Sequence, residues 1–284
     1  MPLVPMRPLL DKAEKGRYAV GAFNCNNMEI VQAIITAATE ENSPVIIQAS
    51  QGALKYAGID YIVALTRVAA EQTHVPVALH LDHGTDFLQI MQCVSRGFTS
   101  VMIDGSKFSL EDNIAITNKV SEVARACGLS VEAELGKIGG TEDHISVSEK
   151  DAIYTDPQEA EYFVKNTDID ALAIAIGTAH GQYKGIPKLD LPRLEKIRSL
   201  ISVPIVLHGS SGVPDDTIRA AIERGVSKIN IDTNVREAFM AGLKDALAEN
   251  PAQIDPRKVL GPARAAMVEI VKEKIRLFGS AGQA

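Results

Sequence analysis

The chain has 284 residues, of which 46% are hydrophobic and 23% are charged, and its formal net charge is −7. This composition is typical of a globular protein, and the acidic balance argues against a nucleic-acid or anionic-membrane surface, because phosphate binding needs a basic face. No apolar run reaches the roughly 18 residues of a membrane-spanning helix, and no signal-peptide pattern is present. Three scattered cysteines without a CxxC motif fit a reduced, cytoplasmic location.

Short apolar runs recur along the chain and alternate with segments of helical spacing. The runs are too continuous for half-exposed strands and too short for helices, which is typical of parallel strands covered on both faces. Eight strand–helix units predict a TIM barrel. The runs are YAVGAF (18–23), PVIIQAS (44–50), PVALHLDH (76–83), SVMIDGS (100–106), LSVEAEL (129–135), DALAIAIG (170–177), VPIVLHG (203–209) and VSKINID (226–232).

Glycines mark the ends of several predicted helices. Gly97, Gly128 and Gly225 each stand just before a strand, as expected for a helix cap in the left-handed conformation. A doubly wound open sheet is the competing architecture, but the first strand–helix turn lacks a GxGxxG motif. We therefore expect one α/β domain over residues 1–284, a (β/α)8 TIM barrel whose tail from about Ala238 forms extra C-terminal helices.

Three histidines stand at or just after the ends of apolar runs, and each is followed by glycine: His83, His180 and His208. In a TIM barrel the active site lies at the carboxyl ends of the strands, so these side chains should converge. Three imidazoles from different elements suit a catalytic zinc ion with one position left for substrate. For any one histidine alone, a hydrogen-bonded core position is the simpler interpretation.

Carboxylates occupy the same ends of the strands. Beside a divalent ion they can bind a second metal, orient the histidines or move protons. Alternation along a strand puts Glu132 and Glu134 on one face, whereas Asp82 and His83 share a face only if the strand ends between them. For Glu132 a structural salt bridge across the barrel is an equal alternative. The acids are Asp82, Asp104, Glu132, Glu134 and Asp232.

Two segments after the last predicted strands point to phosphate. HGSSG (208–212) and INIDTN (229–234) lie where many barrels hold a phosphate on backbone amides and a helix N-terminus. Lys184 and Arg257 could add positive charge. The long connection from Gly136 to Asp168 predicts a loop in which the Gly139-Gly140 pair acts as a hinge and carries Glu142 over the site as a lid.

The motifs VALHLDHG, VMIDGS, VEAELGKIGGTED, AIAIGTAHGQYKG, VPIVLHGSSGVP, KINIDTN and DPRKVLGPAR together resemble those of the class II, metal-dependent fructose-1,6-bisphosphate aldolases and the similar tagatose-1,6-bisphosphate aldolases. The resemblance covers essentially the whole chain. It implies a lyase that reversibly cleaves the ketose bisphosphate to dihydroxyacetone phosphate and glyceraldehyde 3-phosphate. It also implies a cytoplasmic role in glycolysis and gluconeogenesis.

The resemblance also implies roles for individual residues. His83, His180 and His208 would bind one catalytic zinc ion per subunit, and Asp104 and Glu134 a second, exchangeable divalent ion. Asp82 would be the acid/base at the C4 oxygen, and Glu142 would handle the proton at the adjacent carbon. The remaining roles concern substrate: Gly181, Gly209, Ser210, Ser211, Asn230, Ile231, Asp232 and Thr233 for the dihydroxyacetone phosphate half, Asn24 and Ser50 for the aldehyde half, and Arg257 for the other phosphate. Lys184 is a further candidate for substrate binding, through its positive charge.

The family likeness further implies a monovalent cation (Na⁺ or K⁺) near the phosphate loops. It implies phosphorylated ketose and triose substrates and a homodimer or homotetramer, with Arg257 acting across an interface. One departure concerns the segment after VMIDGS, where Lys107 and Phe108 replace the HH or HLP common in relatives. The contacts made there are left open.

Several alternatives remain at the level of sequence. Tagatose 1,6-bisphosphate differs from the fructose compound at one carbon, and the motifs separate the two poorly. An amidohydrolase or a Schiff-base aldolase using Lys228 is another class, disfavoured because Lys228 lies inside a strand. A non-catalytic partner subunit of an aldolase could lose metal ligands freely, yet all three histidines and both proposed acids, Asp82 and Glu142, are present.

Overall fold

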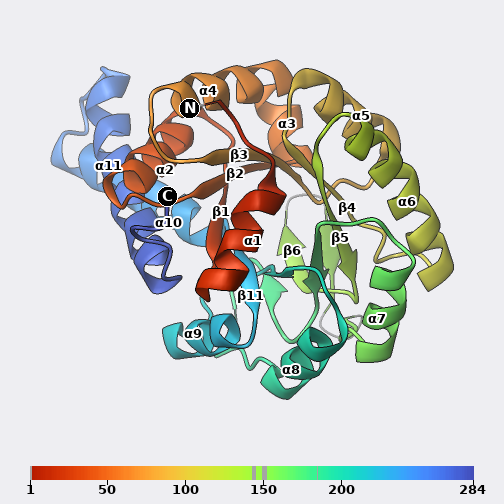
Figure 1. The fold of residues 1–284 in the computed structure, drawn as a ribbon. Coiled ribbons are helices and arrows are strands. Elements are labelled where there is room, and N and C mark those ends of the chain that lie inside the picture. The colour runs from red at the N-terminus through yellow and green to blue at the C-terminus, as the bar shows by residue number, and fades with distance from the viewer. Residues whose placement is uncertain (1, 143–144, 149–151, 184) are drawn as a thin grey trace.

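The structure is a computed structural model that describes residues 2–142, 145–148, 152–183 and 185–284, without the side chains of residues 142 and 145–147. Within these ranges, eight parallel strands form a closed barrel with helices around it (Figure 1). The TIM barrel predicted from the sequence is confirmed. In the order in which they pair around the barrel, the strands are β1 (Val20–Asn24), β2 (Val45–Ser50), β3 (Val77–Asp82), β4 (Ser100–Ile103), β5 (Ser130–Leu135), β8 (Ala171–Ile174), β10 (Ile205–Leu207) and β11 (Val226–Ile231), which closes on β1.

The helices that follow the strands begin and end at residues suited to those positions. Asn27 and Ser109 accept hydrogen bonds from backbone N–H groups in the first turns of α2 and α6. Gly97, Gly128 and Gly225 have φ values of 103°, 75° and 104°, as predicted for left-handed helix ends. The helices are α1 (Met6–Gly16), α2 (Met28–Glu40), α3 (Gln51–Ala57), α4 (Ile59–Glu71), α5 (Phe87–Arg96), α6 (Leu110–Ala126), α7 (Pro157–Lys165), α8 (Leu191–Leu200), α9 (Asp215–Glu223), α10 (Thr233–Glu249) and α11 (Pro256–Leu277).

The N-terminal helix α1 closes one end of the barrel. In Figure 1 it lies across the middle of the ring of strands. Its buried side chains Met6, Leu9 and Leu10 join a cluster with inward-facing barrel residues such as Ala78 and Val206. This apolar floor excludes water from the amino ends of the strands, so the opposite end is where substrate can enter.

The barrel interior becomes polar toward the carboxyl ends of the strands. On β2 the inward-facing side chains run from Ile46 to Gln48, and on β11 Lys228 precedes Asn230 on the same face. The outward-facing side chains instead pack in the large apolar core between strands and helices. The gradient concentrates hydrogen-bonding groups at one end of the barrel.

A small sheet outside the barrel differs from the expected loop after β5. Strands β6 (Gly139–Glu142) and β7 (Ile145–Val147) pair antiparallel, and β6 pairs in parallel with β9 (Ala179–His180). The prediction that Gly139-Gly140 is a free hinge is wrong, because both glycines belong to a paired strand. His180 likewise lies in β9 and not at the end of barrel strand β8.

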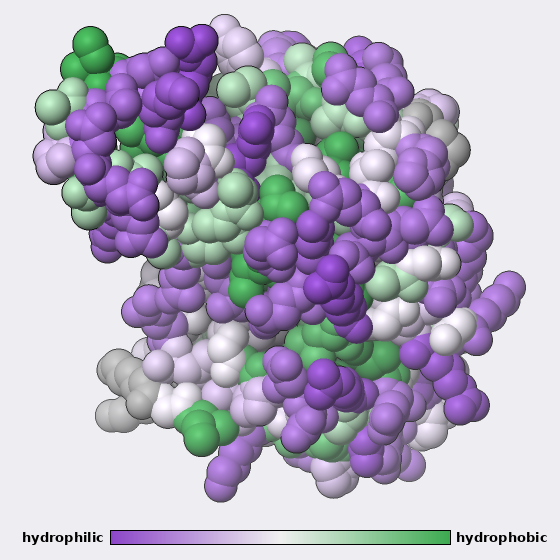
Figure 2. Space-filling model, turned by 90° about the vertical axis from the view of Figure 1, so that its left-hand side faces the viewer, coloured by the Kyte–Doolittle hydropathy of each residue, from purple (hydrophilic) through white to green (hydrophobic). Residues whose placement is uncertain are grey.

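The C-terminal helices pack on the outside of the barrel, as predicted. Helix α10 begins at Thr233, directly after β11, so it is the last helix of the barrel and α11 is the additional one. Helix α11 packs against α10 and α2. Figure 2 looks at this side of the molecule, where hydrophilic side chains dominate the surface. Nowhere in the described part of the chain does a helix combine the length and hydrophobicity needed to cross a bilayer.

Candidate metal centre and active site

The turn after β3 brings two neighbouring polar side chains into one site. Asp82 is the last residue of β3, and His83 has a left-handed φ of 49°. This conformation is uncommon for residues other than glycine, although histidine adopts it more often than most, and such backbone outliers cluster at functional positions. Gly84 follows because a Cβ there would lie 2.4 Å from the Met102 carbonyl oxygen. Because the strand ends at Asp82 and the chain reverses at His83, both side chains can reach the same site although they are neighbours in sequence.

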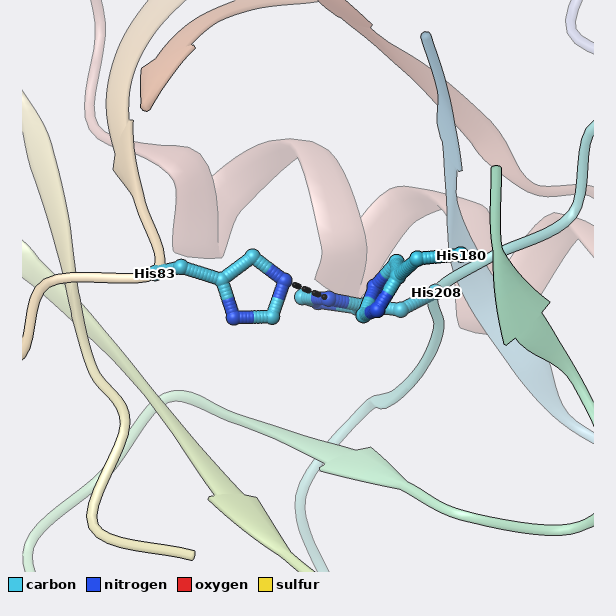
Figure 3. Close-up of side chains that lie close together, drawn as sticks. All are labelled: His83, His180 and His208. Atoms are coloured by element: carbon cyan, nitrogen blue, oxygen red, sulfur yellow. Dashed lines mark hydrogen bonds between the residues drawn. The ribbon is translucent and has the colours of Figure 1, made fainter. Parts of the chain in front are cut away.

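His83, His180 and His208 meet at the carboxyl end of the barrel. Their ring centroids are 4.9 Å (His83 to His180), 4.7 Å (His83 to His208) and 6.0 Å (His180 to His208) apart. In Figure 3, His83 approaches from one side and the other two rings from the opposite side. All three side chains are buried, and a nitrogen of each lies within 4.8 Å of the others. The three predicted ligands therefore form one compact cluster.

Acidic partners fix how two of these rings are protonated. His83 Nδ1 lies 3.2 Å from Asp104 Oδ2, and His208 Nε2 lies 2.8 Å from Glu132 Oε1. Because an ionised carboxylate only accepts hydrogen bonds, each of these nitrogens carries the hydrogen. Metal-binding histidines in proteins show the same arrangement, with the outer N–H donated to a carboxylate.

The inner nitrogens of these two rings face each other. His83 Nε2 and His208 Nδ1 are 3.0 Å apart. Two lone pairs at this distance would repel, so the pair holds either a proton, carried by His83 with its raised pKa, or a bound cation. The donor set is three imidazoles with acidic partners, which fits a borderline-soft divalent ion such as Zn²⁺.

A second acidic group lies beside His83. Asp104 and Glu134 each place an oxygen within 4.8 Å of His83 and of each other. Burial and the neighbouring Asp104 raise the pKa of Glu134 well above its ordinary value. Burial opposes ionisation of Asp104 too, but its hydrogen bond with His83 and the donors of Ser106 lower its pKa. Glu134 Oε2 is buried and makes no hydrogen bond to any described residue, as expected of an oxygen placed to receive a cation.

The three histidines differ in how the site affects their pKa values. Burial and the proximity of His83 lower the pKa of His180 and of His208 well below 6.5. For His83 burial acts in the same direction, but the carboxylates of Asp82, Asp104 and Glu134 outweigh it and raise the pKa. His180 and His208 are therefore neutral near pH 7, the form that binds metal.

Asp82 is held by three amide side chains. Its Oδ2 accepts hydrogen bonds from Asn24 Nδ2 (2.9 Å) and Gln48 Nε2 (3.1 Å), and its Oδ1 accepts one from Asn230 Nδ2 (3.2 Å). Burial opposes ionisation, but His83, His208, Lys228 and the amide of Asn24 lower the pKa. Among the described residues Oδ1 accepts this one hydrogen bond, so it keeps a lone pair for a further donor. The group is a fixed carboxylate base beside the histidine cluster.

A cavity of about 340 Å³ lies beside the histidine cluster and is lined by His180. The N-terminus of α10 borders it, and helix N-termini favour phosphate because their amides and dipole attract anions. The predicted phosphate residues that line the cavity are Gly181, Gly209, Ser210, Ser211, Asn230, Asp232 and Thr233. Gly209 is required because a Cβ there would lie 2.6 Å from the Ala179 carbonyl oxygen.

Comparison with known proteins assigns the family. The model of the family described as fructose-bisphosphate aldolase class-II matches residues 4–283. The chain belongs to this family.

Individual aldolases are similar to this chain over their full length. The chain is 48% identical over 287 residues to a fructose-bisphosphate aldolase of Geobacillus stearothermophilus, covering 100% of this chain and 99% of the relative. It is 47% identical over 308 residues to a fructose-bisphosphate aldolase of Thermus caldophilus, covering 99% of this chain and all of the relative. The crystal structure of the YdjI aldolase from Escherichia coli K12 has a TM-score of 0.86 at 35% identity, with 99% of each chain covered.

Several residues expected to bind substrate make other contacts in this aldolase or lie outside the described residues. Ile231 was expected at the dihydroxyacetone phosphate half, but its side chain packs in the apolar core because it alternates with the inward-facing neighbours Asn230 and Asp232. Ser50 Oγ accepts a hydrogen bond from Ala53 N and caps α3. Arg257 is 87% exposed and paired with Asp255, and it does not line the cavity. Lys184 and the side chain of Glu142 lie outside the described residues.

The structure also adds residues that the sequence reasoning missed. Gln48 donates to both Asp82 and Asn24 Oδ1, and alternation on β2 could have placed it on the same face as Ser50. Arg236 lines the phosphate-side cavity and pairs with Asp232 at 2.7 Å. Its position one helical turn after Asp232 was the sequence signal that could have placed Arg236 on the same side of α10 as the cavity. Glu132, left open before, both bonds His208 and pairs with Lys228.

Proposed function

We propose that this class II aldolase reversibly cleaves fructose 1,6-bisphosphate to dihydroxyacetone phosphate and glyceraldehyde 3-phosphate with a zinc ion held by His83, His180 and His208. The observation that carries the proposal is the histidine cluster with its acidic partners, beside a cavity that adjoins a helix N-terminus. Zinc bound there would act as a Lewis acid on the oxygens of the ketose, which stabilises the negative charge that cleavage develops.

Asp82 is proposed to move the proton of the C4 hydroxyl. Its lowered pKa keeps it ionised near neutral pH, and its free lone pair on Oδ1 can accept the hydroxyl proton as the C3–C4 bond breaks. In condensation Asp82 returns that proton to the aldehyde oxygen. Glu142 is proposed to exchange the proton at C3, and its strand β6 pairs with the strand that carries His180.

The phosphate groups are proposed to bind at two places. Gly181, Gly209 to Ser211 and Asn230 to Thr233 would hold the dihydroxyacetone phosphate half, with Ile231 contributing through its backbone and Lys184 through its charge. Asn24 and Ser50 would contact the aldehyde half. Arg257 would bind the other phosphate from a neighbouring subunit of a homodimer or homotetramer, since it is exposed and does not line the cavity of its own chain.

Further cations and the location complete the proposal. Asp104 and Glu134 would bind a second divalent ion, since both converge on His83. A monovalent cation, Na⁺ or K⁺, would sit near the phosphate loops. A cytoplasmic location agrees with phosphorylated sugar substrates.

The test compares cleavage of fructose and tagatose 1,6-bisphosphate by enzyme that is zinc-loaded, chelator-treated or treated with borohydride in the presence of substrate. We expect fructose cleavage that chelator abolishes, that zinc restores and that borohydride leaves intact. A tagatose kcat/KM tenfold higher would overturn the substrate assignment. Chelator-resistant activity lost on borohydride treatment would overturn the zinc assignment in favour of Lys228.

A further inference from the structure

Glu132 and Lys228 form a buried ion pair inside the barrel that the proposed reaction does not use. Both side chains are 0% exposed, and Lys228 Nζ lies 2.8 Å from Glu132 Oε2. The residues come from β5 and β11, which are separated in the barrel by β8 and β10. The pair therefore crosses the barrel interior, on the inner side of β8 and of the strand β10 that leads to His208.

The two oxygens of Glu132 have different partners. Oε2 faces the ammonium of Lys228, with His80 Nε2 3.6 Å away, while Oε1 accepts the 2.8 Å bond from His208 Nε2. That bond leaves His208 Nδ1 without hydrogen and directed at the cluster. In the opposite tautomer an N–H would point at the cluster, and His208 could not ligate.

Stability alone is a poor reason for such a pair. Removing two charges from water costs about as much as their attraction returns, so buried ion pairs are weak stabilisers. A lysine at a barrel centre also suggests a Schiff base, but Lys228 does not line the substrate cavity and its ammonium is directed at Glu132.

We propose that Lys228 is a positioning residue for the metal centre and that its effect on zinc binding passes entirely through Glu132. The ammonium holds one carboxylate oxygen, which fixes the other against His208 Nε2 and sets that ring's orientation and tautomer. The inference rests on the proposed metal site of His83, His180 and His208. It assigns to this aldolase a chain of contacts from Lys228 to Glu132 to His208.

The test is a double-mutant cycle on the full-length protein with Glu132→Gln, Lys228→Met and the double variant. Zinc affinity is measured by chelator competition, and ligand geometry by the visible spectrum of the Co²⁺-loaded protein. We expect each single variant to lose about 10- to 100-fold in zinc affinity with an altered Co²⁺ spectrum. In the Glu132→Gln background, Lys228→Met should cause no further loss. The double variant leaves no unpaired buried charge, so it keeps the cycle informative if Lys228→Met alone folds poorly.

Arg125→Met is the matched control, because Arg125 pairs with the buried Asp170 away from the histidines. It should lower the melting temperature and leave zinc affinity unchanged. Wild-type zinc affinity in the Glu132→Gln and Lys228→Met variants would overturn the inference while leaving the proposed function intact. If Lys228→Met reduced zinc affinity by the same factor in the wild-type and in the Glu132→Gln background, the inference would also be overturned. A wild-type protein that binds no zinc would instead refute the proposed function, and the inference with it.

Discussion

Asp82→Asn separates proton transfer from metal binding. The substitution keeps the shape of a side chain that is 0% exposed and accepts three hydrogen bonds. The amide oxygen can replace Oδ2 and keep the bonds from Asn24 and Gln48. The new NH₂ then faces Asn230, whose Oδ1 makes no hydrogen bond to a described residue and can accept after an amide flip. We therefore expect the fold to persist.

The expected loss is in the chemical step. Positioned acid/base groups contribute about 10²- to 10⁴-fold, so kcat should fall by that factor, or by about 2.7 to 5.5 kcal/mol in activation free energy. The assay is coupled detection of dihydroxyacetone phosphate, with zinc content measured on the same samples. Asp170→Asn is the control, since Asp170 is another buried, hydrogen-bonded aspartate outside the site. A kcat within threefold of wild type at unchanged zinc content would refute the reasoning.

Three further predictions test the surroundings of the site. Gly140→Ala places a Cβ 2.1 Å from the His180 carbonyl oxygen and should lower kcat about 100-fold. Gly128→Ala, with a similar positive φ and open space around it, should only reduce the melting temperature. Equal kcat values in the two variants would contradict this. Arg236→Gln should raise KM for the bisphosphate about 10- to 100-fold, because a charged contact to phosphate is lost. Arg219→Gln on exposed α9 is the control and should leave KM unchanged. An unaltered KM in the Arg236→Gln variant would contradict the proposal that phosphate binds in this cavity. Burial lowers the pKa of three histidines, so below about 6.5 the unfolded chain binds more protons at these residues than the folded chain does. This outweighs the opposite contribution of His83 and Glu134, whose pKa values are raised. Thermal melts of metal-free protein should therefore show stability falling by about 1.4 kcal/mol per pH unit per extra proton as pH drops toward about 5, and a flat profile would argue otherwise. The histidines with lowered pKa are His80, His180 and His208.

The strands and the histidine cluster could be predicted because both follow from local pattern. Continuous apolar runs fix parallel strands, and strand ends in a barrel must meet at one face. The left-handed turn at His83 could not be derived, since nothing in the residue type requires it and its neighbours impose it. The histidine and aspartate assignments therefore depended on the family resemblance as well as on the pattern.

The small outer sheet escaped prediction for a different reason. Gly139 and Gly140 have low strand propensity, and the partner strand that carries His180 lies about 40 residues farther along the chain. Such pairing is a tertiary effect. Ile231 shows a different limit of a family motif of consecutive residues. Alternation turns its side chain into the core, which leaves only its backbone for the proposed substrate contact.

The most direct test of the metal centre is anomalous diffraction at the zinc absorption edge from crystals of zinc-loaded, catalytically active protein. The account predicts a strong peak in each subunit about 2.0 to 2.1 Å from one ring nitrogen of each of His83, His180 and His208. An active crystal with its zinc peak elsewhere, or with no zinc peak, would contradict the account.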